Sequence, residues 1–472
     1  MHREQNAPSW PRTTVLGLPI SFLCNLVGTV AGTVAGTAAP CAAAEEDPLT
    51  KALRELAAEP SAGSTEVPRQ AAPGRSSVQV GAATLRLIDL SLDGLFAAGT
   101  STEDDESLQS LQGGGHDPRK RGFTVQNVEL SFVGAVDPYL TGEVHIIYFI
   151  EPLDGGSVME LEEAFVTTQA LPFGFQLEAG HFFTEFGRIN AQHPHAWDWQ
   201  DQPVINTRLF GPDGMRGPGA RLGWLSPLPW FSVVHAGLQN ASGETMASFF
   251  SSGELAEERP FGARPFVDGE VHDLGDLAYL LRWENGFDLT PEVSTKAGLS
   301  FLYGPNFTGD EGDTHIYGAD VVVKWRPLSN DHGWPFVIWQ SEIMRRDLRA
   351  AEALDPGADP VDPADDTFFA ADTFHDWGLY TQLLWGFERG WATGLRYEFA
   401  ASEELSASEM ETEPFRNDRH RISPLLVWHP TEFSRLRFQY NYDHARHLHA
   451  DEAHSFWVGI EVLIGSHPAH AY

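Results

Sequence analysis

One pattern repeats along most of this chain: segments in which apolar and polar side chains alternate. Residues 317–326, 435–443 and 456–464 show it most clearly. Successive side chains on a β-strand point to opposite faces, so a period of two predicts strands with one apolar face. We therefore predict an all-β protein built from many such strands.

The connections between these segments alternate between short and long. Short turns that carry Pro, Gly or Asn fall at 137–138, 171–174, 226–229, 285–286, 326–335, 388–390 and 429–431. Longer loops fall near 98–122, 151–159, 184–217, 240–275, 304–314, 347–374, 400–418 and 444–453. Short turns at one end and long loops at the other are typical of a transmembrane antiparallel up-and-down β-barrel. The segments predict about 16 strands, a size that leaves an aqueous channel.

A soluble all-β protein is the alternative, since its strands also alternate, with the polar face outward. Tryptophans favour the barrel, because they cluster at predicted strand ends, where the aromatic girdles of a membrane barrel lie. They are Trp224, Trp230, Trp283, Trp325, Trp334, Trp377, Trp391 and Trp428. In a barrel the apolar face meets lipid and the charged face lines the lumen.

The N-terminus has the pattern of an export signal. A largely apolar stretch over residues 15–39 follows an arginine-bearing start, and three alanines ending at Ala44 offer a cleavage site. We predict a signal peptide over 1–44, with a retained anchor as the alternative. A periplasmic linker with a short helix-forming stretch follows over 45–80, and the barrel over 81–472. Both cysteines precede the cleavage site, so no disulfide is expected. The predicted location is the bacterial outer membrane.

The chain is strongly acidic, with 66 Asp and Glu against 31 Lys and Arg, and a formal net charge of −35. Nucleic acid is not an expected partner, because phosphate neutralisation needs a basic face. Acidic loops at a channel mouth concentrate cations, so we predict a preference for cations. The expected partners are outer-membrane lipid and lipopolysaccharide, together with small hydrophilic solutes or ions.

Residues 186–220 form a long stretch with no strand or helix period of its own. Their many large apolar side chains predict packing inside the barrel rather than a solvated tail. The polar residues in and just beyond this stretch would then line a pore constriction: His193, His195, Asp198, Asp201, Arg208, Arg216 and Arg221. Arginines on polar strand faces are predicted to line the lumen as well: Arg282, Arg326, Arg345, Arg396, Arg421, Arg435 and Arg437. Together with carboxylates on the facing side, these arginines would set up a transverse electric field across the pore. The alternative is that they pair with neighbouring carboxylates and only stabilise the barrel wall and the loop.

One group of residues has the ligand types of a divalent metal such as zinc. It comprises His193, His195 and Asp198, with His181 on the preceding strand to complete it. The spacing matches no standard site, so we expect no resident cofactor and at most weak metal binding. No serine, histidine and acid grouping supports catalysis, and the chain is predicted not to be an enzyme.

The segment FTEFGRINAQHPHAWDWQDQPVINTRLFGPDGMRGPGARL and the terminal HPAHAY resemble the phosphate-selective porins of the O/P type. They resemble more closely a group labelled zinc-regulated TonB-dependent outer-membrane receptors. The resemblance implies a sixteen-stranded channel constricted by its third long loop, inserted by the barrel-assembly machinery, with a homotrimer as one option.

Two features depart from the resemblance. Phosphate selectivity would be expected to come with a basic lumen, whereas this chain is acidic. A TonB-dependent receptor carries a plug domain and about twenty-two strands, whereas the stretch ahead of the first predicted strand reads as linker. The leading hypothesis is thus a porin for passive diffusion of small hydrophilic solutes or ions. The alternatives are a ligand-specific receptor for zinc or a metal chelate, and a structural or adhesive barrel.

Overall fold

A computed structural model of the chain describes residues 76–80, 83–357, 366–403 and 412–465. The predicted signal peptide, most of the predicted linker and the terminal HPAHAY stretch lie outside the described residues. Within the described residues, no helix is both long and apolar enough to cross a membrane.

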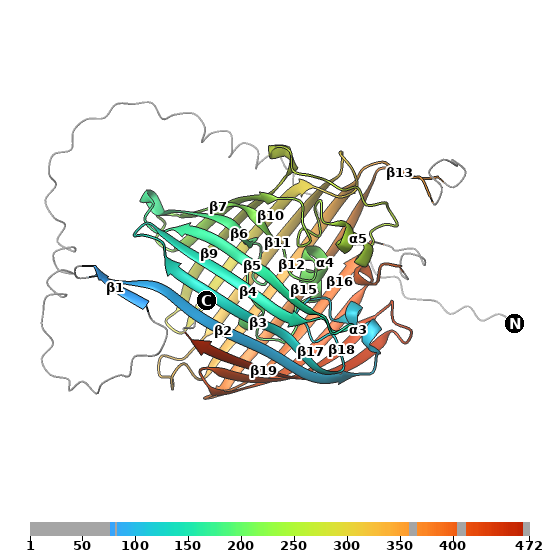
Figure 1. Ribbon diagram of the computed structural model, residues 1–472. Coiled ribbons are helices and arrows are strands. Elements are labelled where there is room, and N and C mark those ends of the chain that lie inside the picture. The colour runs from blue at the N-terminus through green and yellow to red at the C-terminus, as the bar shows by residue number, and fades with distance from the viewer. Residues whose placement is uncertain (1–75, 81–82, 358–365, 404–411, 466–472) are drawn as a thin grey trace, which may run out of the picture. The chain divides into compact units, whose positions relative to one another are not determined.

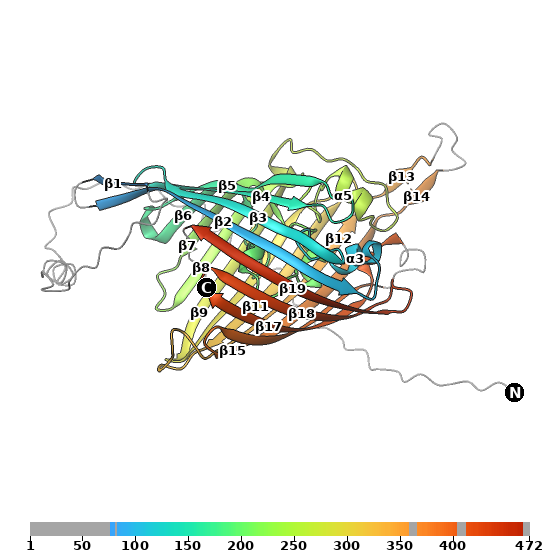
Figure 2. The same ribbon diagram turned by 60° about the horizontal axis from the view of Figure 1, so that its bottom comes forward.

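Sixteen antiparallel strands form a closed barrel, which confirms the predicted fold class and strand number. The strands are β2 (Ala83–Ser101), β3 (Gly122–Ala135), β4 (Leu140–Ile150), β5 (Ser157–Thr168), β6 (Phe175–Phe183), β7 (Arg216–Leu225), β8 (Phe231–Asn240), β9 (Leu277–Thr290), β10 (Val293–Pro305), β11 (Asp313–Trp325), β12 (Phe336–Ala350), β15 (Asp372–Glu388), β16 (Trp391–Ser402), β17 (Arg419–Thr431), β18 (Ser434–Ala445) and β19 (Glu452–Gly465). Each strand pairs with the next along the chain, and β19 pairs with β2 to close the ring (Figures 1 and 2).

In the described parts of the chain, three short strands lie outside this ring. β1 (Ser76–Val80), at the end of the predicted linker, pairs with the start of β2. β13 (Ala353–Asp355) and β14 (Thr367–Phe369) form a separate two-stranded hairpin in the loop between β12 and β15.

The helices that the structure describes are short and lie in the connections. The α-helices are α3 (Asp105–Leu111), α4 (Val204–Phe210) and α5 (Gly253–Glu258). The 3-10 turns are η2 (Pro172–Gly174), η3 (Pro194–Ala196), η4 (Leu274–Asp276) and η5 (Pro414–Arg416). Side-chain caps explain two helix starts: Asp104 accepts a hydrogen bond from the Ser107 amide at 2.8 Å, and Ser252 from the Leu255 amide at 3.3 Å.

The alternation of the sequence becomes an apolar outside and a polar inside. On β18, Arg437, Gln439, Asn441 and Asp443 are buried, whereas Tyr440 on the opposite face is exposed. Large exposed apolar side chains follow the same rule on other strands: Leu222, Leu281, Trp283, Leu299, Ile343, Leu383, Trp385, Leu395, Ile422 and Ile460. This is the reverse of a soluble protein and matches a barrel whose outer face meets lipid.

Among the irregularities in strand pairing, one β-bulge in β3 and one in β5 change which side chains face inward. In β3 the pairing with β2 shifts between Leu95 and Phe96, so that Gln126 is an extra residue next to Asn127. In β5 the pairing with β4 shifts between His145 and Ile146, which makes Glu162 the extra residue next to Glu163. A bulge re-aims one side chain. Each of these two pairs of consecutive residues is buried.

Candidate functional site

The long connection between β6 and β7, residues 184–215, is folded into the barrel, as predicted; we call it the inner loop. It touches strands around the ring. Arg188 Nη1 donates to Glu284 Oε2 on β9 at 3.1 Å, and the Arg188 amide lies 3.3 Å from Glu342 Oε1 on β12. Residues further along contact β3 and β5, and then β16 to β18. Because β5 and β12 lie nearly opposite in the ring, the inner loop crosses the lumen.

The inner loop carries more regular structure than its sequence predicted, since it contains α4 and one 3-10 turn (Figure 1). β7 begins at Arg216, so it takes in the last residues of the stretch 186–220, for which no strand was expected. Pro203 at the start of α4 provides no side-chain cap. Instead the Val204 amide donates to Glu398 Oε2 on β16 at 2.6 Å, so the barrel wall satisfies a free helical N–H group.

Apolar side chains hold the inner loop in the lumen. Buried residues of the loop form one cluster with the connection between β8 and β9 and with the inner faces of the strands: Phe186, Ile189, Trp197, Val204, Ile205, Leu209, Phe210, Met215, Met246, Phe249, Leu280, Leu302, Ile316, Met344 and Tyr380. Glycines on the inner face of the strands leave space for these large side chains. A Cβ on Gly318 would lie 2.6 Å from the Phe186 ring, and one on Gly394 would lie 2.9 Å from the Trp199 ring. The inner face is therefore partly apolar, which the alternation alone did not predict.

On one side of the lumen, imidazoles of the inner loop meet glutamates of β3 and β5. His193 Nδ1 lies 2.8 Å from Glu162 Oε2, and His193 Nε2 lies 2.8 Å from Glu163 Oε2. His195 Nδ1 lies 2.9 Å from Glu129 Oε2. We call these three carboxylates the glutamate wall.

His145 on β4 joins the same cluster. Its Nδ1 lies 3.0 Å from Glu129 Oε1, and its ring centroid lies 4.6 Å from that of His193. Burial alone would lower the pKa of His193, but Glu129 and Glu162 raise it well above its ordinary value. The pKa of His195 is raised in the same way by Glu129, against the effect of burial. Both loop imidazoles are therefore held towards the charged form.

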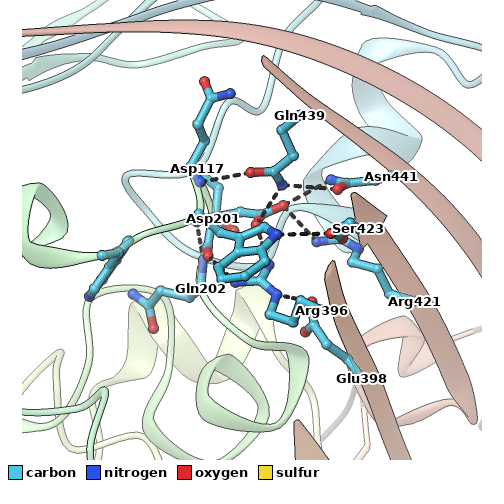
Figure 3. Close-up of polar contacts among 12 residues, drawn as sticks. Asp117, Asp201, Gln202, Arg396, Glu398, Arg421, Ser423, Gln439 and Asn441 are labelled. Carbon is cyan, nitrogen blue, oxygen red and sulfur yellow. Dashed lines mark hydrogen bonds and ion pairs between the residues drawn. The ribbon is translucent and has the colours of Figure 1, made fainter. Parts of the chain in front are cut away.

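On another side of the lumen, a carboxylate of the inner loop meets arginines of β16 and β17 (Figure 3). Asp201 is fully buried, and its Oδ1 accepts from Arg396 Nη2 while its Oδ2 accepts from Arg421 Nη1 at 2.9 Å. Gln439 and Asn441 on β18 donate to the same carboxylate at 2.8 and 2.9 Å. Burial alone would raise the pKa of Asp201, but the two arginines hold it below its ordinary value. We call Arg396 and Arg421 the arginine wall.

Two neighbours of Asp201 reinforce this attachment. Trp199 Nε1 donates to the Ser423 carbonyl on β17 at 3.0 Å, and Arg396 lies over the Trp199 ring at 5.3 Å. The Gln200 amide donates to Gln439 Oε1 at 2.8 Å. The stretch around Asp201 is thus fixed to three adjacent strands.

A cavity of about 590 Å³ lies beside the inner loop. It is lined by His193, His195, Asp198 and Asp201, by inner-face residues of β11 to β19, and by His429, Glu432 and Phe433 around the short turn between β17 and β18. The cavity therefore reaches the end of the barrel that carries the short turns.

The other predicted constriction residues lie apart from one another. Asp198 lines the cavity, and burial raises its pKa against the opposing charges of Arg435 and Arg437. Arg208 on α4 donates to the Asn417 carbonyl at 2.5 Å. Arg216 pairs with Glu160 on β5, and Arg221 pairs with Glu178 on β6 and Glu185. The loop histidines and Asp201 thus face different walls.

Five of the predicted lumen arginines face inward, all with carboxylate partners. They are Arg282 (with Asp320), Arg396 and Arg421 (with Asp201), and Arg435 and Arg437 (with Glu461). Two placements were wrong. Arg326 is exposed in the turn after β11. Arg345 is on the exposed outer face of β12, beside Asp347, and its neighbour Arg346 is the inward residue, paired with Asp376 at 2.6 Å. Because Arg345 and Arg346 are adjacent, the sequence pattern allows either one to face inward. Only the pairing of β12 with its neighbours decides which one does.

The predicted metal ligands are only partly brought together. Among the described residues, possible ligand atoms gather in two sets, Glu129 with His193 and His195, and His145 with Glu163 and His193. His181 and Asp198 belong to neither set. His181 lies on β6, where it pairs with Ala164 of β5 and Pro218 of β7.

Sequence reasoning missed the partners of the two loop histidines. Glu129 and His145 occupy polar positions of alternating segments, so the alternation could have placed both on the inner face. Glu162 carried no such signal, because its inward direction depends on the bulge in β5.

No protein-family model matches the sequence. An uncharacterized protein of Aquifex aeolicus (strain VF5) is 28% identical over 412 residues, covering 82% of this chain and 80% of that protein. Among solved structures, OprB of Pseudomonas putida matches with a TM-score of 0.50 at 10% identity, covering 80% of this chain and 94% of that one. The outer membrane channel DcaP of Acinetobacter baumannii matches with a TM-score of 0.49 at 11% identity, covering 80% and 97%. The likeness to OprB shows a shared fold. The O/P-type and zinc-regulated labels stay predictions.

Proposed function

We propose that this protein is an outer-membrane channel for small hydrophilic solutes or ions, with a passage whose width is set by the inner loop. The observation that carries the proposal is the combination of an apolar outer face with a charged inner face that encloses a cavity of about 590 Å³. A closed barrel of this strand number has room for an aqueous path.

The outer surface supports residence in a membrane. Its exposed leucines, isoleucines and aromatics extend over neighbouring strands all around the ring, far beyond the apolar patches of soluble proteins. Aromatic side chains gather next to the short turns, where Trp391 stacks on Trp428 at 5.6 Å and Phe175 on Trp224 at 6.2 Å. Such a girdle is typical of the membrane interface.

The inner loop supports a narrow passage. It is attached to strands on nearly opposite sides of the ring, and α4 packs with Phe249 and Tyr380 in the interior. On the side of the long loops, the spaces near α4 measure about 40 and 10 Å³. We infer that conduction increases when the inner loop moves away from either wall.

A preference for cations is part of the proposal. We attribute this preference to carboxylates on the long loops. The cavity lining is nearly balanced, since Glu185, Asp198, Asp201, Glu432 and Glu461 face Arg188, Lys324, Arg396 and Arg435. Exposed carboxylates instead gather on the connection between β8 and β9: Glu254, Glu257, Glu258, Asp268 and Glu270. Their field attracts cations to the mouth.

Conductance of the purified full-length protein in a planar bilayer tests the proposal. We expect steady ohmic conductance, and a larger conductance when residues 192–198 are deleted, because this shortens the inner loop while keeping the Asp201 attachment. Deleting residues 353–369, the part of the chain that carries β13 and β14, is the control and should change conductance little. Inserted barrels that never conduct would contradict the channel and favour a ligand-specific receptor. Equal effects of the two deletions would contradict the role of the inner loop.

A further inference from the structure

We propose that the inner loop and the glutamate wall together form a site for one first-row divalent cation. The ligands are His193 and His195 from the loop and Glu129 from β3, with Glu162 from the β5 bulge as the fourth. This set replaces His181 and Asp198, which the sequence suggested. Imidazole nitrogens with carboxylate oxygens suit zinc and its neighbours in the first row.

The ligand atoms already converge. Atoms of Glu129, His193 and His195 all lie within 4.8 Å of one another. Two ligands that each lie about 2.0–2.1 Å from a tetrahedral ion are about 3.3 Å apart. His193 Nδ1 and Glu129 Oε2 lie 3.3 Å apart, and His195 Nδ1 and Glu129 Oε2 lie 2.9 Å apart. Small movements of the two rings would therefore admit an ion.

The groups behind these ligands have the arrangement that metal sites use. A ligating histidine usually gives its second N–H to a carboxylate, which fixes the ring. His193 Nε2 lies 2.8 Å from Glu163 Oε2, and the other oxygen of Glu163 accepts from the Phe183 amide at 2.8 Å. Likewise, Ser131 Oγ donates to Glu129 Oε1 at 2.7 Å, which leaves Glu129 Oε2 to face the histidines.

An independent observation also points to a ligand. Glu162 is buried, and its Oε1 has no hydrogen-bond partner among the described residues. A buried carboxylate oxygen without a partner is costly unless a cation compensates it. The charged and titratable groups around the site include Asp93, Glu129, Glu143, Glu160, Glu163, His145, His193, His195 and Arg216. The carboxylates are in excess over the permanent cations, so a divalent ion would improve the charge balance.

An ion can reach the site from the cavity, because His193 and His195 both line it. Once bound, the ion would join residues 193–195 of the inner loop to β3 and β5. If the proposed channel is correct, binding would hold the loop across the lumen and lower the conductance. This consequence rests on the proposed function, whereas the binding site does not.

Equilibrium dialysis of the full-length protein against Zn²⁺, after stripping with EDTA, tests the site. We expect one ion per chain, and a loss of affinity of at least about 100-fold in His193→Gln/His195→Gln, since even outer-shell changes cost about 10–100-fold. The matched control is His420→Gln/His444→Gln, which removes two neighbouring rings on β17 and β18, 6.3 Å apart, and should stay within about threefold of the parent. The visible spectrum of bound Co²⁺ gives a second readout, because its d–d bands report the coordination number and geometry of the site.

Heat-modifiability on gels shows whether each variant still forms the barrel. Should the loop variant fail to fold, Glu162→Gln keeps the shape of the bulge and is expected to weaken binding about 10-fold. Zinc binding that is unchanged in both variants, or lost equally in the control, would overturn the site. Zinc binding without a change in conductance would overturn only the proposal that the bound ion holds the inner loop across the lumen. A barrel that binds zinc as predicted but never conducts would contradict the channel and leave the site standing.

Discussion

The two walls that hold the inner loop differ in the permanence of their charge. On the arginine wall, Arg396 and Arg421 meet a carboxylate, and guanidinium stays charged at every physiological pH. On the glutamate wall, Glu129 and Glu163 meet imidazoles, whose charge depends on pH and whose nitrogens also bind metals. The first attachment is thus constant, and the second responds to protons and cations. The inner loop would therefore swing about its arginine side and release from its glutamate side.

The largest expected effect comes from breaking the constant attachment. Asp201→Asn keeps the shape of the side chain but removes the charge that Arg396 and Arg421 share. Breaking a buried ion pair typically costs about 3–5 kcal/mol, because the partner stays buried without compensation. We expect a lower midpoint of heat-modification and a larger conductance. Glu398 and Asp443 also pair with these arginines, so the barrel itself should remain closed.

Asp198→Asn is the control for this prediction. Asp198 lines the cavity three residues before Asp201 and is not among the hydrogen-bond partners of the Asp201 carboxylate. Its replacement should leave the midpoint nearly unchanged. Similar losses in both variants would show that general charge balance, and not the Asp201 attachment, holds the loop.

A smaller effect is expected from titrating the responsive attachment. The pKa of His193 is raised in the folded protein by Glu129 and Glu162, against burial. Its stabilising contribution is complete below the unfolded pKa of about 6.5 and is lost as pH rises through the folded value. In EDTA, conductance should therefore rise at alkaline pH. Single-channel recordings from below about pH 6.5 to alkaline pH measure this rise in conductance.

Two variants sharpen the pH experiment. His193→Gln removes the titrating ring and should flatten the profile. His181→Gln removes a histidine of β6 that lies outside the cluster and should keep the parental profile. A rise in conductance that persists in His193→Gln would assign the pH response to another group.

The different predictability of the two walls has a physical origin. Alternation is local, so it placed Arg396 and Arg421 on the inner face of a barrel whose strand number was also predictable, and it could have placed Glu129 there too. The alternation rule fails where a bulge inserts one residue, as at Glu162. It also fails where two adjacent residues are of the same type, as at Arg345 and Arg346, because either could face inward. Pairing across the lumen is not local at all. His195 meets Glu129, 66 residues away, and nothing in either segment indicates its partner.

The smallest expected effect concerns ion selectivity, and it tests whether either wall takes part in it. In the cavity lining, Asp201 is neutralised by Arg396 and Glu461 by Arg435, so the arginine wall should contribute little net field. The exposed carboxylates of the long loops should then produce a modest cation preference. That preference should fade as the Debye length falls from about 30 Å at 0.01 M salt to about 3 Å at 1 M. Reversal potentials in a salt gradient measure this preference.

Replacing Glu254, Glu257 and Glu270 with Gln should reduce the permeability ratio by less than about threefold, because the field of exposed charges is screened by water and salt. A preference for anions, or a cation preference that survives at 1 M salt, would instead place selectivity at the walls, where buried charges are screened least.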